Sequence, residues 1–337
     1  MHERGFVVAP SWYAEGIGPP AISHEDALAT QPRLISALAG RIALVKGVAL
    51  ALACRRGTLA VIKGASGSLS AIAASALLNR DRRVVVLEFI VRPESRSSVR
   101  ATLREAGRRL VEAPCIRRAM AVGHVLTDDE RTEYAAKYGL SAERLVKVRW
   151  PLCRTGAGSL AEITGEFRRV LSSGRAGSDW ETLFRAADGA DWSLTVICSS
   201  IDEQRVRNLS RGRANVHIEL SRAAHDSILR ESDVYVMAMK ERGVSAGHVR
   251  LMAAVEAGIP VVASEIRALD EYVVPGETAV MIPPGAASAL RREVDALLED
   301  PSRRQALRDA ALARARAWTH EHYFERMRAL ILSVGAS

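Results

Sequence analysis

Short apolar runs alternate with amphipathic segments along most of the chain. Residues 58–63 (TLAVIK) and 84–90 (VVVLEFI) are continuous apolar runs between polar flanks, which is typical of buried strands. Residues 69–78, between them, carry apolar side chains at helical spacing. A strand, a helix and a second strand in this order predict a right-handed crossover and a parallel sheet. The same pattern predicts a further strand at 122–126 and a helix at 128–138.

The second half of the chain repeats this alternation. The pattern predicts strands over residues 170–173, 194–198, 216–220, 234–237, 261–263 and 280–282. It predicts helices over residues 179–187, 203–210, 225–231 and 248–257, then over 287–318 with a break at Pro301, and over 320–332. This alternation predicts a doubly wound α/β domain with helices on both faces of the sheet.

A length of 337 residues corresponds to about two domains of ordinary size. The stretch PLCRTGAGS, after Trp150, is rich in the residues of linkers. Two α/β domains that face each other would form a cleft into which the strand carboxyl ends point. We therefore expect an N-terminal domain over residues 1–152, a linker over 153–166, a C-terminal domain over 167–318, and a helix over 319–337 that packs back across the domains.

Composition narrows the class of protein. Hydrophobic residues make up 48% of the chain and charged residues 26%, which excludes a mainly disordered chain. Residues 34–54 come nearest to the roughly 20 apolar residues of a spanning helix, but Arg41 and Lys46 interrupt them. The four cysteines have no metal-ligand spacing, and the N-terminus lacks the order of a secretory signal. A cytoplasmic protein is expected. The net charge of +8 is compatible with nucleic acid, an anionic membrane or a phosphorylated substrate.

The most informative segment is residues 231–285. It contains a strand, a loop with Ser245, Ala246 and Gly247, a helix, and a turn that leads into another strand. Small residues before a helix let backbone N–H groups approach an anion, and the helix dipole favours negative charge there. The alternative is an ordinary connection between a strand and a helix.

The blocks SDVYVMAM, SAGHVRLMAAVEAGIPVVAS and PGETAVMIPPGA, with Glu271 before the last, occur in this order. They resemble the donor domain of the retaining family 4 glycosyltransferases of the GT-B class. The resemblance covers about residues 167–330 and is weaker over 58–152. It implies an α/β fold with two facing, Rossmann-like, doubly wound domains. It also implies a metal-independent enzyme without a cofactor, which moves a sugar from a nucleotide-diphosphate donor to an acceptor hydroxyl with retention.

The resemblance also implies roles for single residues of the donor site. In VLSSGRAGSDWETL, Gly174 and Arg175 match the family's Gly-Arg pair, which implies that Arg175 grips the donor diphosphate together with the amides after Ser245. The family's second cation has no clear counterpart beyond Ser178. His248, in the first turn of the helix, is a candidate catalytic residue that contacts a phosphate or the sugar. The alternative is a partly exposed polar residue at a helix start.

One departure from the family concerns its paired glutamates, eight residues apart. The chain has Ser245 and Ala253 at those positions, and an alanine side chain accepts no hydrogen bond from ribose hydroxyls. Glu256, about one helical turn further on, is a candidate substitute, and the alternative is a solvated or capping carboxylate. Together with Ala253 and Glu256, Ile218 is assigned to the ribose and base region.

The first half offers weaker candidates. Glu88 lies near a strand end and is a candidate catalytic residue that contacts an acceptor hydroxyl. The turn KGASGS, residues 63–68, either contacts a phosphate or the acceptor, or is only a tight turn. The segment from Arg96 to Arg118 is basic and amphipathic. Such a helix lies on the inner face of an anionic membrane, binds an acidic acceptor, or is simply a solvated face.

Three functions remain open. The first is a sugar transferase whose acceptor is a small natural product, a nucleotide-like molecule or a glycolipid precursor. The second is a non-catalytic GT-B protein, a pseudo-enzyme or a partner of another glycosyltransferase, which Ala253 and the absent second cation favour. The third is a nucleic-acid binder, which only the charge suggests. Aromatic residues are 5% of the chain and no aromatic–basic motif is present, so nucleic acid is not expected.

Overall fold

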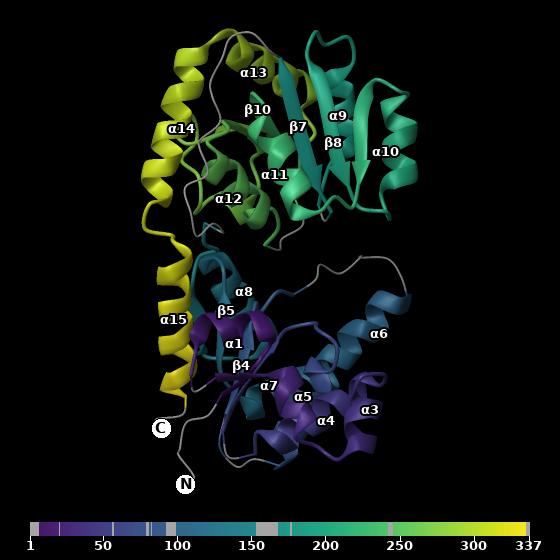
Figure 1. Ribbon diagram of the computed structural model, residues 1–337, viewed down its shortest axis with the longest axis vertical. Coiled ribbons are helices and arrows are strands. Elements are labelled where there is room, and N and C mark those ends of the chain that lie inside the picture. The colour runs from purple at the N-terminus through teal and green to yellow at the C-terminus, as the bar shows by residue number, and fades with distance from the viewer. Residues whose placement is uncertain are drawn as a thin grey trace. The chain divides into compact units, whose positions relative to one another are not determined.

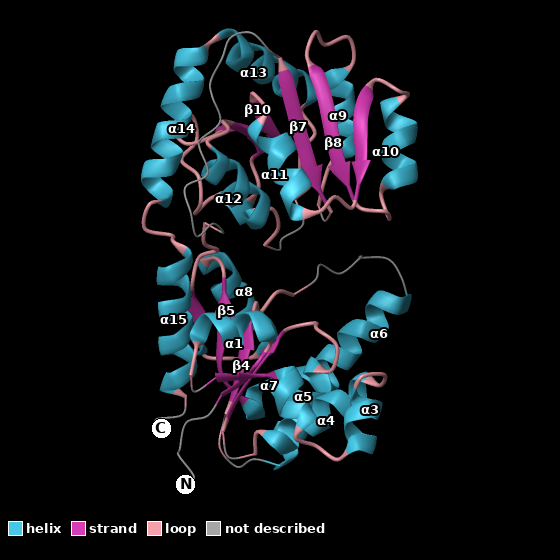
Figure 2. Ribbon diagram, viewed as in Figure 1, coloured by secondary structure: helices cyan, strands magenta, loops and turns pink. Residues whose placement is uncertain are grey.

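The chain folds into two compact units, each built around a parallel sheet (Figures 1 and 2). The first unit comprises Met1–Arg149 and Glu321–Ser337, and the second comprises Trp150–His320. The computed structural model describes residues 7–19, 21–55, 57–78, 81, 83–91, 99–152, 168–175, 177–241 and 245–334. The expected linker over 153–166 lies outside these residues.

The sheet of the first unit has six parallel strands in the order β2-β1-β3-β4-β5-β6. The strand order reverses between β1 and β3, which is the switch point of a doubly wound sheet. Two central strands are almost entirely buried and mostly apolar, as expected of a parallel sheet covered on both faces. The bounds are β1 Val7–Ala9, β2 Ala21–Ser23, β3 Thr58–Ile62, β4 Val84–Leu87, β5 Met120–Val125 and β6 Leu145–Lys147.

The helices of the first unit follow the predicted rhythm from residue 58 onward. The predicted strand over 84–90 ends early, because Glu88 adopts a positive φ of 44° that no strand continues through. Pro114 does not interrupt the helical segment, because a π-helical turn, η1, leads into α7 and the proline lies in the first turn of α7. The helices are α1 Ser11–Ile17, α2 His24–Ala29, α3 Arg33–Ala39, α4 Ala43–Ala53, α5 Ser68–Leu78, α6 Val99–Gly107, η1 Arg108–Glu112, α7 Ala113–Ala119, α8 Asp128–Tyr138 and the 3-10 turn η2 Ala142–Arg144.

The C-terminal helix α15 (His320–Ser333) packs within the first unit. Its buried residues Tyr323, Phe324, Met327 and Ile331 join a core cluster that also holds Tyr13 of α1. Chain ends far apart in sequence thus build one core.

The sheet of the second unit has the order β12-β11-β10-β7-β8-β9, all parallel, with its switch point between β10 and β7. Separate core clusters contain residues from the sheet and from the helices packed against it. The strands are β7 Arg169–Gly174, β8 Ser193–Cys198, β9 Ala214–Ile218, β10 Val234–Met237, β11 Val261–Ser264 and β12 Val280–Ile282. The helices are α9 Trp180–Ala187, α10 Glu203–Ser210, α11 Arg222–Arg230, α12 His248–Ala257, the 3-10 turn η3 Arg267–Leu269, α13 Ala287–Glu299 and α14 Pro301–Ala315.

The predicted α/β, doubly wound class is therefore confirmed in both units. Within the described ranges, no helix is both long enough and apolar enough to span a membrane.

Candidate functional site

A pocket of ≈ 580 Å³ opens at the carboxyl ends of β7, β8 and β9 in the second unit. Its lining comes from the ends of these strands and from the first turns of α11 and α12. It lies beside the switch point of the sheet, where doubly wound folds bind their ligands. The lining contains five predicted donor-site residues, Gly174, Arg175, Ser245, Ala246 and Gly247, together with Ala253. Tertiary structure thus brings together two segments that are about seventy residues apart.

Arg250 of α12 lines the same pocket, and sequence reasoning missed it. Its Nη1 donates to the Ser173 carbonyl at 2.6 Å and to Ser178 Oγ at 3.2 Å. Burial lowers the pKa of its guanidinium, which stays charged because an arginine pKa starts so high. A Cβ on Gly174 would overlap Arg250 Nη1, so glycine at that position makes room for the arginine. The signal in the sequence was an arginine in the first turn of the helix after the small-residue loop.

The loop before α12 reaches its turn through Gly247. This residue has φ +92°, a region that side chains rarely adopt. A Cβ there would also lie 2.9 Å from Met237 Cε and 3.0 Å from Met239 Sδ. The positive φ favours glycine here, and any other residue would also have to displace the two methionine side chains. The turn aims the N-terminus of α12, with its positive end of the helix dipole, at the pocket.

Arg175 lies at the rim of the pocket, and its side chain is 75% exposed. Its Nη2 pairs with Glu219 Oε2 at 2.7 Å, and Glu219 Oε1 accepts from the Ser200 amide at 3.2 Å. Glu219 follows β9 with φ +50°, a strained conformation for a residue with a side chain. The predicted strand over 216–220 ends at Ile218 for this reason. An anion that enters the pocket therefore meets an arginine already paired with a carboxylate.

A hydrogen-bonded set of polar side chains lies next to Arg250. Ser173 Oγ lies 3.0 Å from His225 Nε2 and 2.6 Å from Tyr235 Oη. Burial raises the pKa of the Tyr235 phenol, so this group is un-ionised at neutral pH. These bonds fix the end of β7 and the first turns of α11 against each other.

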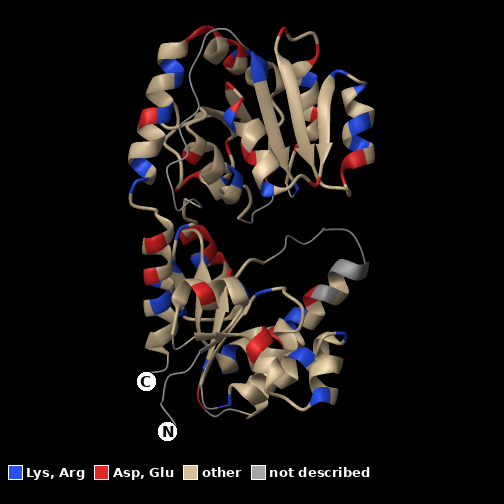
Figure 3. Cartoon of the chain, viewed as in Figure 1, with Lys and Arg blue, Asp and Glu red and all other residues tan. Residues whose placement is uncertain are grey.

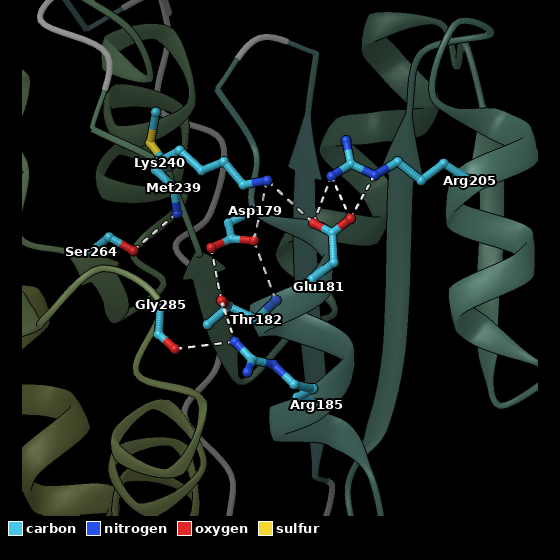
Figure 4. Close-up of polar contacts among 9 residues, drawn as sticks. All are labelled: Asp179, Glu181, Thr182, Arg185, Arg205, Met239, Lys240, Ser264 and Gly285. Atoms are coloured by element: carbon cyan, nitrogen blue, oxygen red, sulfur yellow. Dashed lines mark hydrogen bonds and ion pairs between the residues drawn. The ribbon is translucent and has the colours of Figure 1, made fainter.

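A second network braces the loop between β7 and α9 (Figure 4). Asp179 caps α9 by accepting from the Thr182 amide at 3.3 Å and from its hydroxyl at 2.7 Å. Lys240 reaches Glu181 at 3.4 Å and Asp179 at 3.8 Å. The Arg205 ion pair lowers the pKa of Glu181 to about 2. The Asp179 amide also donates to the Ala238 carbonyl at 2.8 Å, so the loop that carries Gly174 and Arg175 is tied to the end of β10.

The structure does not bring His248 to the pocket lining. The side chain is buried, and its Nε2 donates to the Ala268 carbonyl at 2.7 Å. Its ring lies 4.3 Å from that of Tyr272. In this position His248 ties the start of α12 to the segment after β11. Burial lowers its pKa to about 4, against the opposing effects of the hydrogen bond to the Ala268 carbonyl and of the Glu271 charge.

Two of the buried histidines, His248 and His124, are expected to lower the stability of the protein in mild acid. His248 and His124, which also has a pKa of about 4 because of burial, stay neutral in the folded protein. The unfolded chain binds a proton at each near the ordinary value of 6.5. The free energy of unfolding should therefore fall as the pH drops from 6.5 to 4, by up to about 1.4 kcal/mol per pH unit for each histidine.

Urea unfolding at pH 7.5, 6 and 5 measures this slope. His248→Gln should flatten it for the second unit and His124→Gln for the first, where the charge of Arg326 also lowers the His124 pKa. A slope in His248→Gln equal to that of the parent would show that the proton is bound elsewhere.

The three residues assigned to the ribose and base region do not lie together at the pocket. Ala253 is in the pocket lining, whereas Glu256 and Ile218 are outside it. The carboxylates that do line the pocket are Glu219 and Asp226. Sequence reasoning missed both, since Glu219 lies just past its strand in a conformation that only the fold reveals.

In the first unit, Glu88 belongs to a buried polar cluster at the carboxyl end of β4. Tyr13 Oη donates to Glu88 Oε1 at 3.0 Å, and Tyr323 Oη lies 2.7 Å from the Tyr13 hydroxyl. The Glu88 amide donates to His124 Nδ1 at 3.3 Å, so the Nε2–H of His124 donates to the Val148 carbonyl at 2.9 Å. Burial raises the pKa of Glu88. A carboxyl held in this way can exchange a proton nearer to neutral pH than an ordinary glutamate.

The turn over residues 63–68 borders a hollow of ≈ 190 Å³ at the switch point of the first sheet. Ser11, His24 and Lys46 complete part of its lining. The Ser68 hydroxyl donates to the Ile62 carbonyl at 2.7 Å, a bond that closes the turn.

The segment from Arg96 to Arg118 is helical in α6, η1 and α7, beginning at Val99 within the described residues. Its Leu103, Leu110 and Val111 are exposed, while Ile116 is buried. Arg108 and Arg109 both pair with Glu105. Arg96 lies outside the residues that the structure describes.

Within the described part of the chain, no three or more His, Cys, Asp or Glu side chains are grouped so as to hold a metal ion.

The chain is similar to known glycosyltransferases, in sequence over one segment and in fold over nearly its whole length. Residues 178–300 match the family Glycosyl transferases group 1. No curated protein sequence matches the chain. A glycosyltransferase from Rickettsia africae ESF-5 is 10% identical, with 99% of each chain covered and a TM-score of 0.67. Anabaena Alr3699/HepE, in complex with UDP-glucose, is 14% identical over 98% of this chain and 99% of its own, with a TM-score of 0.67. Sucrose-phosphate synthase from Thermosynechococcus elongatus is 18% identical over 95% of this chain and 82% of its own, with a TM-score of 0.61.

The chain therefore has the GT-B glycosyltransferase fold of two Rossmann-like domains, as predicted. The segment that matches the group 1 glycosyl transferases begins at Ser178 and includes α11 and α12 with most of the pocket lining, while Gly174 and Arg175 lie just before it.

Proposed function

We propose that the protein is a glycosyltransferase that binds the diphosphate of a nucleotide-sugar donor in the pocket at the carboxyl ends of β7, β8 and β9. The observation that carries the proposal is the convergence of Arg250, Arg175 and the N-terminus of α12 on one pocket in the part of the chain that matches the group 1 glycosyl transferases. Guanidinium groups and helix N-termini are the protein's usual partners for phosphate oxygens. The structure of Anabaena Alr3699/HepE is a complex with UDP-glucose, so uridine diphosphate is the first nucleotide to test.

The chemistry follows from where negative charge develops. As the sugar leaves, charge accumulates on the diphosphate, and two guanidinium groups with a helix dipole stabilise it without a metal ion or another cofactor. Retention, the stereochemistry of family 4, fits an acceptor hydroxyl that attacks from the face of the leaving group and passes its proton to a phosphate oxygen. Glu88, with its raised pKa, is our candidate for contact with that hydroxyl. The acceptor is a small hydroxylated molecule or a glycolipid precursor.

Replacing either partner of the Arg175–Glu219 ion pair should change nucleotide affinity, in opposite directions for the two residues. Arg175→Ala removes an exposed cation and should weaken binding of uridine diphosphate by about fivefold, since exposed charges contribute roughly 1 kcal/mol. Glu219→Gln removes the competing carboxylate and should strengthen binding by a similar factor. Isothermal titration calorimetry with the nucleotide measures both. Weaker binding in Glu219→Gln would instead assign Glu219 to the ligand, as an acceptor for ribose hydroxyls.

The second candidate function is a GT-B protein that binds the nucleotide but transfers no sugar. Ala253 favours it, because no carboxylate projects from this position of α12 into the pocket. Release of uridine diphosphate from UDP-sugars, measured with a panel of hydroxylated acceptors, separates the two. Turnover that Arg250→Met abolishes supports the transferase; nucleotide binding without release over the whole panel supports the non-catalytic protein.

A further inference from the structure

Large apolar side chains are exposed mainly on one unit. Of the sixteen such side chains among the described residues, fourteen belong to the first unit. Nine of them lie on α3, α4 and α5 and on the turn between α3 and α4. We call them the leucine surface, which comprises Leu34, Leu38, Ile42, Leu44, Val48, Leu52, Leu69, Leu77 and Leu78. Soluble monomers rarely expose apolar patches of this kind unless something binds there.

The spacing of these residues shows that the exposure is organised. On α4, Leu44, Val48 and Leu52 recur every four residues and form a stripe along one helix face. Leu34, Leu38 and Ile42 repeat the same spacing over α3 and the turn after it. A surface helix normally turns such a stripe toward the core, yet here the core is filled by small residues such as Gly47, Ala51 and Ala71.

The three helices lie side by side. α4 packs against both α3 and α5, and Figure 1 shows them together at the lower right of the first unit. Gly47 permits this contact, because a Cβ there would lie 2.5 Å from the Ala71 amide nitrogen. The exposed stripes therefore lie on three adjacent helices of the first unit.

The charge of this region has a single sign. Between Asp26 and Asp81 the sequence contains no acidic residue. α3 and α4 accordingly carry blue residues, α5 carries no charged residue, and none of the three helices carries a red one (Figure 3). The nearest preceding acids, Glu25 and Asp26, accept hydrogen bonds from Ser11 and Ser23. The cations in the interval are Arg33, Arg41, Lys46, Arg55, Arg56, Lys63 and Arg80.

Three of these cations border the leucine surface directly. Arg33 begins α3, Arg41 precedes α4 and Arg55 follows it, and all three are exposed. Among the residues that the structure describes, none of the three forms an ion pair with an acidic side chain. Apolar stripes flanked by cations are the pattern of a surface that lies on an anionic bilayer, with leucines in the acyl boundary and arginines at the headgroups.

We propose that the first unit binds the surface of an anionic membrane through the leucine surface, with Arg33, Arg41 and Arg55 at the lipid headgroups. A second copy of the chain fits less well, because a two-fold interface would place cations opposite cations. This surface is separate from the basic segment over residues 96–118, where Arg108 and Arg109 are already paired with Glu105. The proposal does not depend on sugar transfer.

Sedimentation of the full chain with lipid vesicles tests the proposal. Vesicles of phosphatidylcholine with about one third phosphatidylglycerol should bind the protein at least tenfold more tightly than phosphatidylcholine alone, since each cation near the surface contributes roughly a factor of five. Raising the salt concentration to about 0.5 M should weaken this binding, because the headgroup contacts are screened.

Two double variants separate the apolar and charged contributions. Leu44→Asn with Leu52→Asn should lower binding to anionic vesicles by about tenfold or more, since each removes an inserted side chain. Arg41→Gln with Arg55→Gln should remove most of the preference for anionic lipid. The matched control is Ile201→Asn with Arg316→Gln, two exposed residues of the second unit, which should bind as the parent does.

Several results would overturn the proposal. Equal binding to neutral and anionic vesicles, or parent-like binding by both double variants, would do so. A dimer in light scattering that Leu44→Asn with Leu52→Asn dissociates would assign the surface to a second copy. Loss of vesicle binding only in Leu103→Asn with Leu110→Asn would assign membrane contact to α6 and η1. Thermal unfolding of each variant shows whether the protein is folded.

Discussion

Replacing Arg250 with methionine is expected to weaken the binding of uridine diphosphate by about tenfold to a hundredfold. A hydrogen bond to a charged group contributes roughly 1.5–3 kcal/mol, and a guanidinium can offer two to a diphosphate. The Arg250 side chain is partly buried and contacts the Ser173 carbonyl, the Ser178 hydroxyl and the Met239 sulfur, so its position is fixed before the ligand arrives. Preorganisation of this kind makes its loss more costly than that of the exposed Arg175.

The same substitution leaves carbonyl and hydroxyl acceptors without a donor, so it should also lower the stability of the second unit by about 1–3 kcal/mol. Arg291→Met is the matched control. Arg291 donates to the carbonyls of Ala186, Asp188 and Gly189, but it lies on α13 outside the pocket. It should lose similar stability and retain nucleotide affinity. Titration calorimetry and thermal unfolding of both variants measure the two effects.

Arg250→Lys is a third variant to compare, since lysine keeps the positive charge but lacks the planar guanidinium group that forms two parallel hydrogen bonds. Affinity between those of the parent and Arg250→Met is expected. If Arg250→Met binds uridine diphosphate as the parent does, the diphosphate does not lie beside α12 and the proposed donor site is wrong.

Replacing Gly247 with alanine should destabilise the second unit by about 2–4 kcal/mol. Part of this cost is the positive φ of 92°, which a residue with a Cβ adopts at about 1 kcal/mol or more. The rest comes from overpacking, because the new Cβ would lie 2.9 Å from Met237 Cε and 3.0 Å from Met239 Sδ. Movement of the loop away from these methionines would also shift the start of α12 and weaken nucleotide binding.

Gly276→Ala isolates the contribution of backbone strain. Gly276 has φ +77°, and no atom lies within 4 Å of the position that its Cβ would take. We expect a loss of about 1 kcal/mol there, with nucleotide affinity unchanged. Chemical denaturation of the two variants gives the comparison. Equal losses would mean that the methionines move aside freely and that the turn, rather than its packing, requires glycine.

The hydrophobic pattern predicted most elements correctly. Five elements begin and end at the predicted residues, namely α8, α10, β10, α12 and β12. Each lies between strong local signals: α8 is capped by Thr127 and stopped by Gly139 in a left-handed conformation. The first 57 residues were not predicted in this way. β1 and β2 have three residues each, too few for a period to appear, and unlike the equally short β12 they do not continue an alternation of strands and helices that the pattern had already predicted.

By itself the sequence determined the doubly wound fold of both units and most of the small-residue lining of the pocket in the second unit, because strand–helix alternation and the turns before helices are encoded locally. Only the tertiary structure placed Arg250 against Gly174, buried His248 away from the pocket, and left the leucines of α3, α4 and α5 exposed. These outcomes depend on which helix face meets which neighbour. The local sequence pattern of a helix is compatible with burial of more than one of its faces. The packing of segments that are distant in sequence decides which face is buried.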